Sequence, residues 1–283
     1  LIFKKPLDVG GPVGLSATAN IFLGQVEAPL LVRPYLASMT KNELLILMTV
    51  GMSTIAGSVM VIYTTMLSPI YGLGLIGHFL TASLISVPAG IMYANMMIPS
   101  ETKTDFPADD SSKMYSSSMD ALTRGTQAGI DIFLNVAAML IVVMALVFLV
   151  NATLGVLPDF QGQPLTMERI VGWIFAPLAW CMGIPWQESQ AAGELLGVKT
   201  ILNEFVAYIY LADTSTYVLS EKSSLIMLYA LCGFANFSSV GILLSGMSAM
   251  VPERRKDLIA VSVKALWAAL LASCMTGFIV GIL

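Results

Sequence analysis

A charge-free apolar stretch, residues 44–67, reads LLILMTVGMSTIAGSVMVIYTTML and decides the class of fold. A helix needs about 20 apolar residues to cross the hydrocarbon core of a bilayer, so this stretch is long enough to span a membrane. Three further windows carry no Lys, Arg, Asp or Glu, namely Pro69–Pro99, Ile132–Pro158 and Leu225–Val251. A fifth, Leu258–Leu283, holds one lysine close enough to its first end to reach the interface. The sequence therefore predicts five membrane crossings.

The composition of the 283-residue chain agrees with this prediction and excludes several functions. Hydrophobic residues make up 57% and charged residues 11%, whereas a soluble domain is about a quarter charged. The net charge of −4 gives no basic excess for a nucleic-acid polymer. The three cysteines form no CxxC pair, and the single histidine excludes an HExxH site. We expect an all-α polytopic membrane protein that is not an enzyme and carries no cofactor.

Two other apolar regions, Pro12–Leu36 and Val171–Leu211, contain carboxylates close to helix breakers. Glu27 lies beside Pro29 in the first region, and Glu204 lies in the second. An ionisable group at membrane depth next to a break is typical of a re-entrant hairpin, so each region is interpreted as a pair of half-crossing segments. Each hairpin precedes two spans, which predicts an inverted repeat with one additional scaffold helix.

This reading divides the chain into four parts. We expect residues 1–99 to hold the first hairpin and two transmembrane helices, and residues 159–283 to hold the second hairpin and two more. Residues 132–158 form the scaffold helix. Residues 100–131 are interpreted as a cytoplasmic interfacial helix, with a solvated linker as an equal alternative. Because the chain opens on Leu1 without a signal peptide, we expect the numbering to begin inside a longer protein.

The lysines and arginines at the span ends predict the orientation. With Arg254–Lys256 placed in the cytoplasm, the C-terminus lies outside, and ten basic residues lie inside against three outside. The inside set is Lys4, Lys5, Arg33, Lys41, Lys103, Lys113, Arg124, Arg254, Arg255 and Lys256, and the outside set is Arg169, Lys199 and Lys222. This bias predicts the orientation, and we expect a multi-pass protein of the inner or plasma membrane.

Short polar clusters at membrane depth mark candidate functional residues, because an unpaired polar group there costs several kcal/mol. The segment Asn20–Pro29 offers an amide and a carboxylate beside Gly24. Within the first span, Ser53–Ser58 is interpreted as a helix-packing surface in preference to an unwound stretch that holds a cation. Asn203–Phe205 brings a second carboxylate. Phe234–Ser239 combines an amide, hydroxyls and aromatic rings, a mixture suited to a polar organic ligand with a flat face.

At these clusters the chain resembles the concentrative nucleoside transporter family. The resemblance is carried by Gly24–Tyr35, which reads GQVEAPLLVRPY, by Asn203–Tyr208, which reads NEFVAY, and by Ala230–Ser239, which reads ALCGFANFSS. It covers essentially the whole chain in order, apart from helices that family members have ahead of the first hairpin. It implies nucleoside import driven by sodium, with a proton as the alternative coupling ion, through an elevator-like movement in a homotrimer.

The resemblance also implies roles for individual residues. Gln25, Glu27 and Val59 would face the nucleobase, with Val26 beside them, while Phe234 would line the pocket. Glu204, Asn236 and Ser239 would hold the ribose hydroxyls, which fits the donors and acceptors of these side chains. The implied sodium ligands are Asn20 with its side chain and carbonyl, the carbonyls of Leu23 and Ile55, and the Thr54 hydroxyl.

One residue departs from the family pattern. Family members commonly have Thr or Ser between the amide and the carboxylate of the first hairpin, and here the residue is Val26. The missing hydroxyl bears on base selectivity and on the coupling ion, although Asn20 and Thr54 favour sodium. The alternatives to a nucleoside carrier are a carrier of another polar metabolite, such as a nucleobase or an amino acid, and a channel or non-transporting membrane scaffold.

Overall fold

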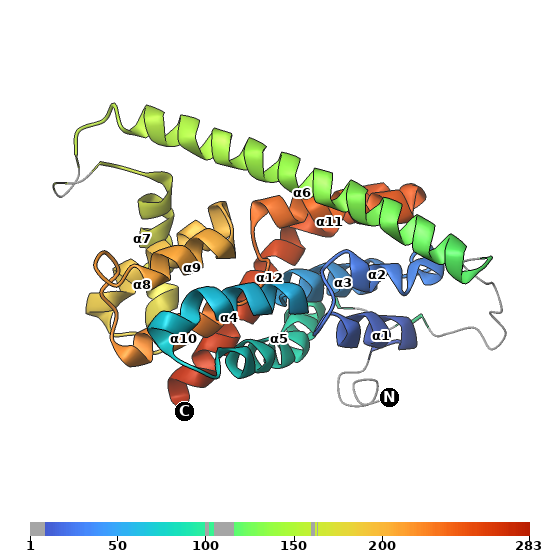
Figure 1. The fold of residues 1–283 in the computed structure, drawn as a ribbon, viewed down its shortest axis with the longest axis horizontal. Coiled ribbons are helices and arrows are strands. Elements are labelled where there is room, and N and C mark those ends of the chain that lie inside the picture. The colour runs from blue at the N-terminus through green and yellow to red at the C-terminus, as the bar shows by residue number, and fades with distance from the viewer. Residues whose placement is uncertain (1–8, 100–101, 105–115, 160–161, 163) are drawn as a thin grey trace.

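The computed structural model describes residues 9–99, 102–104, 116–159, 162 and 164–283, and the elements in this part of the chain are helices. Figure 1 shows the helices stacked side by side, with the long helix α6 crossing one side of the stack. In chain order they are α1 (Gly11–Ala19), α2 (Glu27–Leu30), η1 (Arg33–Tyr35), α3 (Lys41–Ser53), α4 (Gly57–Tyr71), α5 (Leu75–Met97), α6 (Ser118–Leu154), α7 (Met167–Cys181), α8 (Trp186–Ile201), α9 (Glu204–Ala212), α10 (Glu221–Ala230), α11 (Phe237–Met250), η2 (Pro252–Arg254) and α12 (Arg255–Ile282).

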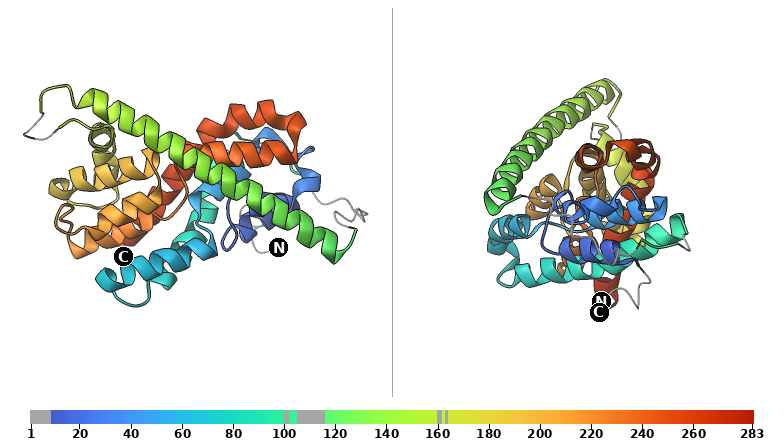
Figure 2. Two further views of the ribbon diagram at one scale, coloured as in Figure 1. Left: turned by 45° about the horizontal axis from the view of Figure 1, so that its top comes forward. Right: turned by 90° about the vertical axis from the view of Figure 1, so that its right-hand side faces the viewer.

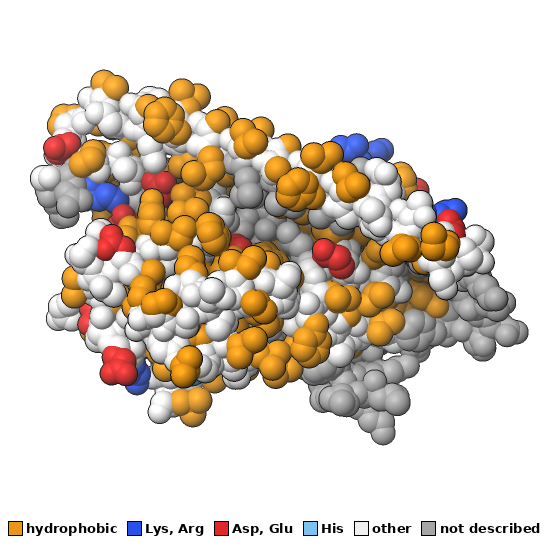
Figure 3. Space-filling model, viewed as in Figure 1, with side chains coloured by type: hydrophobic (Ala, Val, Ile, Leu, Met, Phe, Trp, Pro, Cys, Tyr) orange, Lys and Arg blue, Asp and Glu red, His pale blue; other side chains and the backbone are white. Residues whose placement is uncertain are grey.

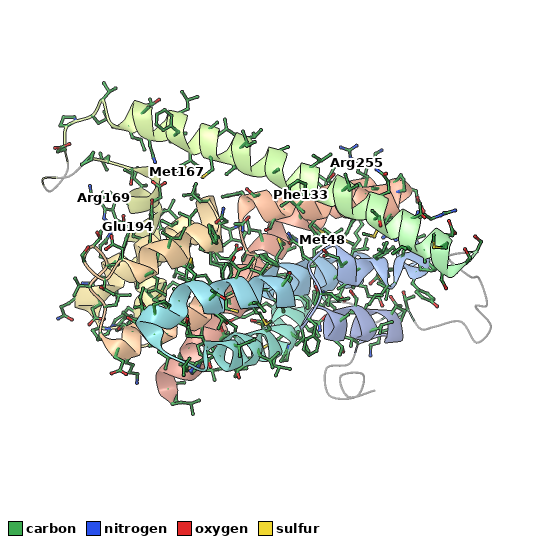
Figure 4. The ribbon with its side chains drawn as sticks, viewed as in Figure 1. Met48, Phe133, Met167, Arg169, Glu194 and Arg255 are labelled. Atoms are coloured by element: carbon green, nitrogen blue, oxygen red, sulfur yellow. The ribbon has the colours of Figure 1, made fainter. Side chains whose placement is uncertain are left out.

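The centre of the molecule is built from α3, α5, α10 and α12, and α12 contacts the other three. Almost every side chain of α3 is buried, among them Met48, which Figure 4 places in the interior. Along α12 the buried residues include small ones such as Ala265, Ala269 and Gly277, which let neighbouring helices approach closely. Many large hydrophobic side chains are exposed, and on the face drawn in Figure 3 the charged side chains lie mostly toward the two ends. This arrangement is typical of a protein surrounded by lipid.

Part of the predicted set of spans is found as helices of sufficient length. Within the described residues, three segments are long and apolar enough to cross a bilayer: Lys41–Tyr71, counted across an interruption, Leu75–Met97 and Pro252–Ile282. The boundary expected at Ser68 lies further along, because α4 continues through Pro69 to Tyr71. The turn is made instead by Gly72 and Gly74, which adopt positive φ angles.

Two of the predicted continuous spans, Leu44–Leu67 and Leu225–Val251, are interrupted, and this corrects the sequence prediction. The first breaks between Ser53 and Gly57, so the interpretation of Ser53–Ser58 as a surface for packing alone was wrong. The second breaks between Ala230 and Phe237. The two breaks meet, because the Phe234 amide donates to the Thr54 carbonyl at 3.4 Å. Backbone groups released by one break are thus satisfied partly by the other.

The first predicted hairpin contains α1, a turn and the short helix α2, whereas the second region holds more than the expected pair of segments. Val171–Leu211 includes most of α7, the whole of α8 and most of α9. Helix α7 ends near Gly183, which has a φ of +96°, and α8 begins after Pro185. Glycines let α7 and α8 pack closely, since a Cβ on Gly193 would lie 2.7 Å from the Ala176 nitrogen. Figure 4 places Arg169 and Glu194 on this helix pair.

Helix α6 is continuous from Ser118 to Leu154, although the sequence predicted an interfacial segment ending at residue 131 and a separate span from Ile132. The glycines of this region, Gly125 and Gly129, are tolerated inside the helix, and no proline interrupts it. Residues 100–101 and 105–115 of the predicted interfacial segment lie outside the described residues. Helix α6 contacts α11 and α7, and Figure 2 shows it running along the outside of the stack.

Candidate functional site

A cavity of about 360 Å³, here called the central cavity, lies where the interruptions in the helices meet. Its walls come from the tip of the first hairpin, the α3–α4 break, the α8–α9 turn and the α10–α11 break with the start of α11. The lining residues are Gly24, Gln25, Val26, Glu27, Ala56, Ser58, Val59, Asn203, Glu204, Phe205, Phe234, Asn236, Ser238, Ser239 and Ile242. The structure therefore brings together every residue that the sequence analysis assigned to a substrate.

Helices α4, α9 and α11 all begin at the central cavity. Asn203 caps α9 by accepting a hydrogen bond from the Val206 amide at 2.9 Å, and Asn236 caps α11 by accepting from the Ser239 amide at 2.7 Å. Side-chain caps of this kind satisfy the amides left free at the start of a helix. The helix N-termini also carry partial positive charge, which favours a carboxylate beside them. Glu204, the first residue of α9, occupies such a position.

Glu204 is held by donors from two other elements. Its Oε1 accepts a hydrogen bond from the Tyr63 hydroxyl at 2.8 Å, and its Oε2 accepts from the Asn236 Nδ2 at 3.0 Å. The cap on α11 engages Asn236 Oδ1, so the amide of Asn236 is oriented with its donor toward Glu204. A carboxylate can accept about four hydrogen bonds, which leaves acceptor capacity on both oxygens. Glu204 can therefore accept hydrogen bonds from a polar ligand without losing its protein partners.

The wall formed by the first hairpin differs in chemistry. Gln25 is buried, and its Oε1 has no hydrogen-bond partner among the described residues. The carboxylate of Glu27 folds back against Gly24, where any larger residue would overlap it. Val26 packs against Gly246, since a Cβ added there would lie 2.7 Å from a Val26 methyl group. An amide and a carboxylate thus face the cavity, while Val26 also contacts α11.

The four residues implied as sodium ligands lie on two segments that the structure joins. The Gly57 amide at the α3–α4 break donates to the carbonyl of Phe22 in the first hairpin at 2.9 Å. Asn20 is fully buried, and its Oδ1 lacks a hydrogen-bond partner among the described residues. Thr54 is also buried and donates its hydroxyl to the Val50 carbonyl at 3.0 Å, which leaves its lone pairs free. With the Leu23 and Ile55 carbonyls, these oxygens suit a hard cation.

Sequence reasoning missed several residues of the site. Tyr63 contacts Glu204 directly. The only feature of the sequence that pointed to a place at the site was its position four residues after Val59. An aromatic residue in an apolar span gives no indication of a polar role. Ser58, Phe205 and Ser238 line the cavity without an assigned role, although each belongs to a cluster that the sequence analysis singled out. The Ser238 hydroxyl has no partner among the described residues and is a further free polar group.

Comparison with known proteins identifies the family. Residues 78–281 match the family model described as "Na+ dependent nucleoside transporter C-terminus". The chain belongs to this nucleoside transporter family. The resemblance to concentrative nucleoside transporters is thereby confirmed, and the chain is placed in a family of membrane proteins, in agreement with its apolar helices.

Individual relatives extend the match beyond the family model. An uncharacterized transporter of Haemophilus influenzae is 42% identical over 99% of the chain and 67% of its own length. The nucleoside permease NupC of Helicobacter pylori is 36% identical over 99% of the chain and 66% of its length. Human solute carrier family 28 member 3 is 39% identical over 94% of the chain. The chain spans about two thirds of the bacterial relatives and 40% of the human one.

Solved structures agree with the fold. CNTnw in an inward-facing substrate-bound state matches with a TM-score of 0.83 and 36% identity, covering 99% of the chain and 66% of CNTnw. A CNTnw variant in an intermediate state matches with a TM-score of 0.86 and 37% identity, covering 99% of the chain and 68% of the variant. The all-helical prediction is confirmed by these matches.

Proposed function

We propose that the protein imports nucleosides across the cell membrane by coupling their entry to sodium. The observation that carries the proposal is the central cavity, in which the amide and carboxylate of Gln25 and Glu27 face a ligand together with the Glu204–Asn236 pair. The first pair offers donors and acceptors to the edge of a base, and the second to a ribose diol. The nucleoside permease and solute carrier relatives support the same substrate class.

Sodium is the coupling ion in this proposal, because the buried Asn20 Oδ1 and the Thr54 hydroxyl supply oxygens of the kind a hard cation requires. A relative named sodium/nucleoside cotransporter 1 supports this choice over a proton. Asn20 and Thr54, together with the Leu23 and Ile55 carbonyls, would bind the ion beside the nucleoside. Ion binding at the first hairpin would then stabilise the wall of the nucleoside site.

The mechanism that we propose is alternating access by an inverted repeat. The order helix, turn, short helix, broken helix and long helix occurs first in α1–α5 and again in α8–α12, which supports a repeat. In the proposed arrangement the two hairpins enter from opposite sides and the nucleoside is held near mid-membrane. The active form is a homotrimer in the inner or plasma membrane, with Arg254–Lys256 facing the cytoplasm and the C-terminus outside.

The test is uptake of uridine and adenosine into proteoliposomes, first with a sodium gradient and then with a proton gradient alone. We expect saturable uptake that depends on sodium. Uptake with the proton gradient alone would show that the coupling ion is a proton and not sodium. Uptake of a free nucleobase or an amino acid in preference to a nucleoside would show that the substrate belongs to another class. Unsaturable flux without counterflow would indicate a channel, and binding without uptake would indicate a scaffold.

Glu204→Gln provides the matched site variant. It keeps the size of the side chain, but it replaces a charged acceptor of two hydrogen bonds by an amide. Hydrogen bonds to charged groups are worth about 1.5–3 kcal/mol, so we expect nucleoside affinity to fall at least about tenfold. The variant should assemble as the wild type does in size-exclusion chromatography. If the purified variant bound nucleosides with wild-type affinity, Glu204 would not be a ligand-binding residue.

A further inference from the structure

Tyr63 lies behind the wall of the central cavity and contacts two lining residues, Glu204 by a hydrogen bond and Phe205 by ring packing. It is 2% exposed, it is absent from the cavity lining, and its hydroxyl donates to Glu204 Oε1 at 2.8 Å. The hydrogen bond joins α4 in the first half of the chain to α9 in the second half. Because Tyr63 does not line the cavity, it can act on a ligand only through lining residues, and its polar contact among them is with the Glu204 carboxylate.

Aromatic neighbours fix the position of the Tyr63 ring. Its centroid lies 4.9 Å from that of Tyr208 in a tilted arrangement, 6.2 Å from Phe205 in a stacked one, and 6.1 Å from Phe79 edge to face. Aromatic pairs at these separations are attractive and restrict the side-chain rotamer. The hydroxyl of Tyr63 is therefore presented to Glu204 from a rigid support.

We infer that Tyr63 is a positioning residue that orients the Glu204 carboxylate toward the ribose hydroxyls of a nucleoside, an inference that rests on the proposed function. Donors reach the two carboxylate oxygens from different elements, Tyr63 on α4 and Asn236 at the α10–α11 break. Two such contacts define the plane of the carboxylate, and with it the direction of the remaining lone pairs. With the Tyr63 contact removed, Oε1 loses its donor from α4, and the plane of the carboxylate is held less firmly.

Tyr71 offers a matched control on the same helix. It lies about two turns further along α4, and its hydroxyl donates to the Leu211 carbonyl of α9 at 3.0 Å. Tyr71→Phe therefore removes a tyrosine hydrogen bond between the same two helices, but at the end of α9 that lies away from Glu204. A purely structural effect on the α4–α9 contact would be produced by both variants.

The experiment compares binding of uridine and 2′,3′-dideoxyuridine to the purified wild type, Tyr63→Phe and Tyr71→Phe. Uridine carries the hydroxyls that Glu204 would bind, and the dideoxy compound lacks them. For Tyr63→Phe we expect the uridine Kd to rise about tenfold, as for one hydrogen bond to a charged group, and the dideoxyuridine Kd to change less than about twofold. Tyr71→Phe should leave both constants within about twofold of the wild type.

The outcomes separate the inference from the function on which it rests. The positioning role would be overturned if Tyr63→Phe lost affinity equally for both compounds. It would also be overturned if the ratio of the two Kd values in this variant equalled that of the wild type. A similar loss in Tyr71→Phe would assign the effect to helix packing and overturn it as well. If the wild type binds neither compound, the proposed function fails and the inference fails with it. Thermal unfolding of all three proteins verifies that each is folded.

Discussion

Gly233 lies in the α10–α11 break, where it packs against the end of α3. Its φ is +145°, a conformation that residues with a side chain rarely adopt. A Cβ at this position would lie 2.8 Å from the Ser53 carbonyl oxygen and 3.0 Å from the Ser273 hydroxyl oxygen. The Ser53 oxygen belongs to the backbone at the end of α3, so it cannot turn away as a flexible side chain would. Gly233→Ala therefore strains the contact between the α3–α4 and α10–α11 breaks.

The expected loss of stability has two parts. Placing alanine in an unfavourable backbone region costs about 1–3 kcal/mol. Overpacking against atoms that are not free to move costs about 1–3 kcal/mol more. Gly233→Ala should therefore reduce the free energy of unfolding by about 2–6 kcal/mol. Because Phe234 and Asn236 follow directly in the chain, the variant should also weaken nucleoside binding.

Gly72→Ala separates the two contributions. Gly72 also has a positive φ, of +79°, but a Cβ there would meet nothing within 4 Å among the described residues. This control should therefore lose only the backbone contribution, about 1–3 kcal/mol, and should keep wild-type affinity for uridine. The assay is unfolding by SDS titration in mixed micelles, followed by uridine binding. Equal losses of stability in Gly233→Ala and Gly72→Ala would refute the argument that the two breaks are in tight contact.

Two further substitutions test the cation site and a surface contact. Thr54→Ala removes a hydroxyl of the proposed sodium site. We expect the sodium concentration for half-maximal uptake to rise several-fold while the protein stays folded. An unchanged dependence on sodium would show that Thr54 is not a ligand. Arg254 donates from one guanidinium nitrogen to the carbonyls of Ala37 at 2.8 Å and Met39 at 2.6 Å. Arg254→Ala should lower the free energy of unfolding in an SDS titration by about 1–3 kcal/mol, and a change below about 0.5 kcal/mol would show that water replaces these bonds.

The candidate site was predicted better than the helices that build it. Polar groups inside an apolar region are costly and therefore point to function, and this allowed four residues to be selected: Gln25, Glu27, Glu204 and Asn236. Family motifs supplied their roles. Their convergence on one cavity is a structural finding, whereas the roles themselves remain proposals. Tyr63 could not be selected, since its sequence context is that of an ordinary membrane helix.

The helix breaks were missed because their cause is not local. Nothing in Ser53–Gly57 prohibits a helix, and threonine and serine occur inside membrane helices. The break becomes favourable only because the Gly57 amide finds the Phe22 carbonyl and the Thr54 carbonyl accepts from Phe234. Both partners are distant in the sequence. At α6 the opposite occurred, because a boundary was predicted inside a helix that is continuous. The prediction relied on the local change from polar to apolar composition, and such a change does not end a helix.

The two breaks differ in how the carbonyls at the end of the preceding helix are satisfied, and this difference bears on the proposed position of the sodium ion. At the end of α10, the Leu228 carbonyl accepts from Tyr208 at 2.8 Å, the Tyr229 carbonyl from Thr276 at 3.1 Å and the Ala230 carbonyl from Lys199 at 2.8 Å. Lys199 is fully buried there, and its side-chain nitrogen satisfies the last of these carbonyls. The α3–α4 break is joined instead to the first hairpin, where Asn20 Oδ1 has no hydrogen-bond partner in the part of the chain that the structure describes. The proposed sodium site therefore belongs at the first break, whereas at the second break a lysine side chain of the protein donates to the last carbonyl of α10.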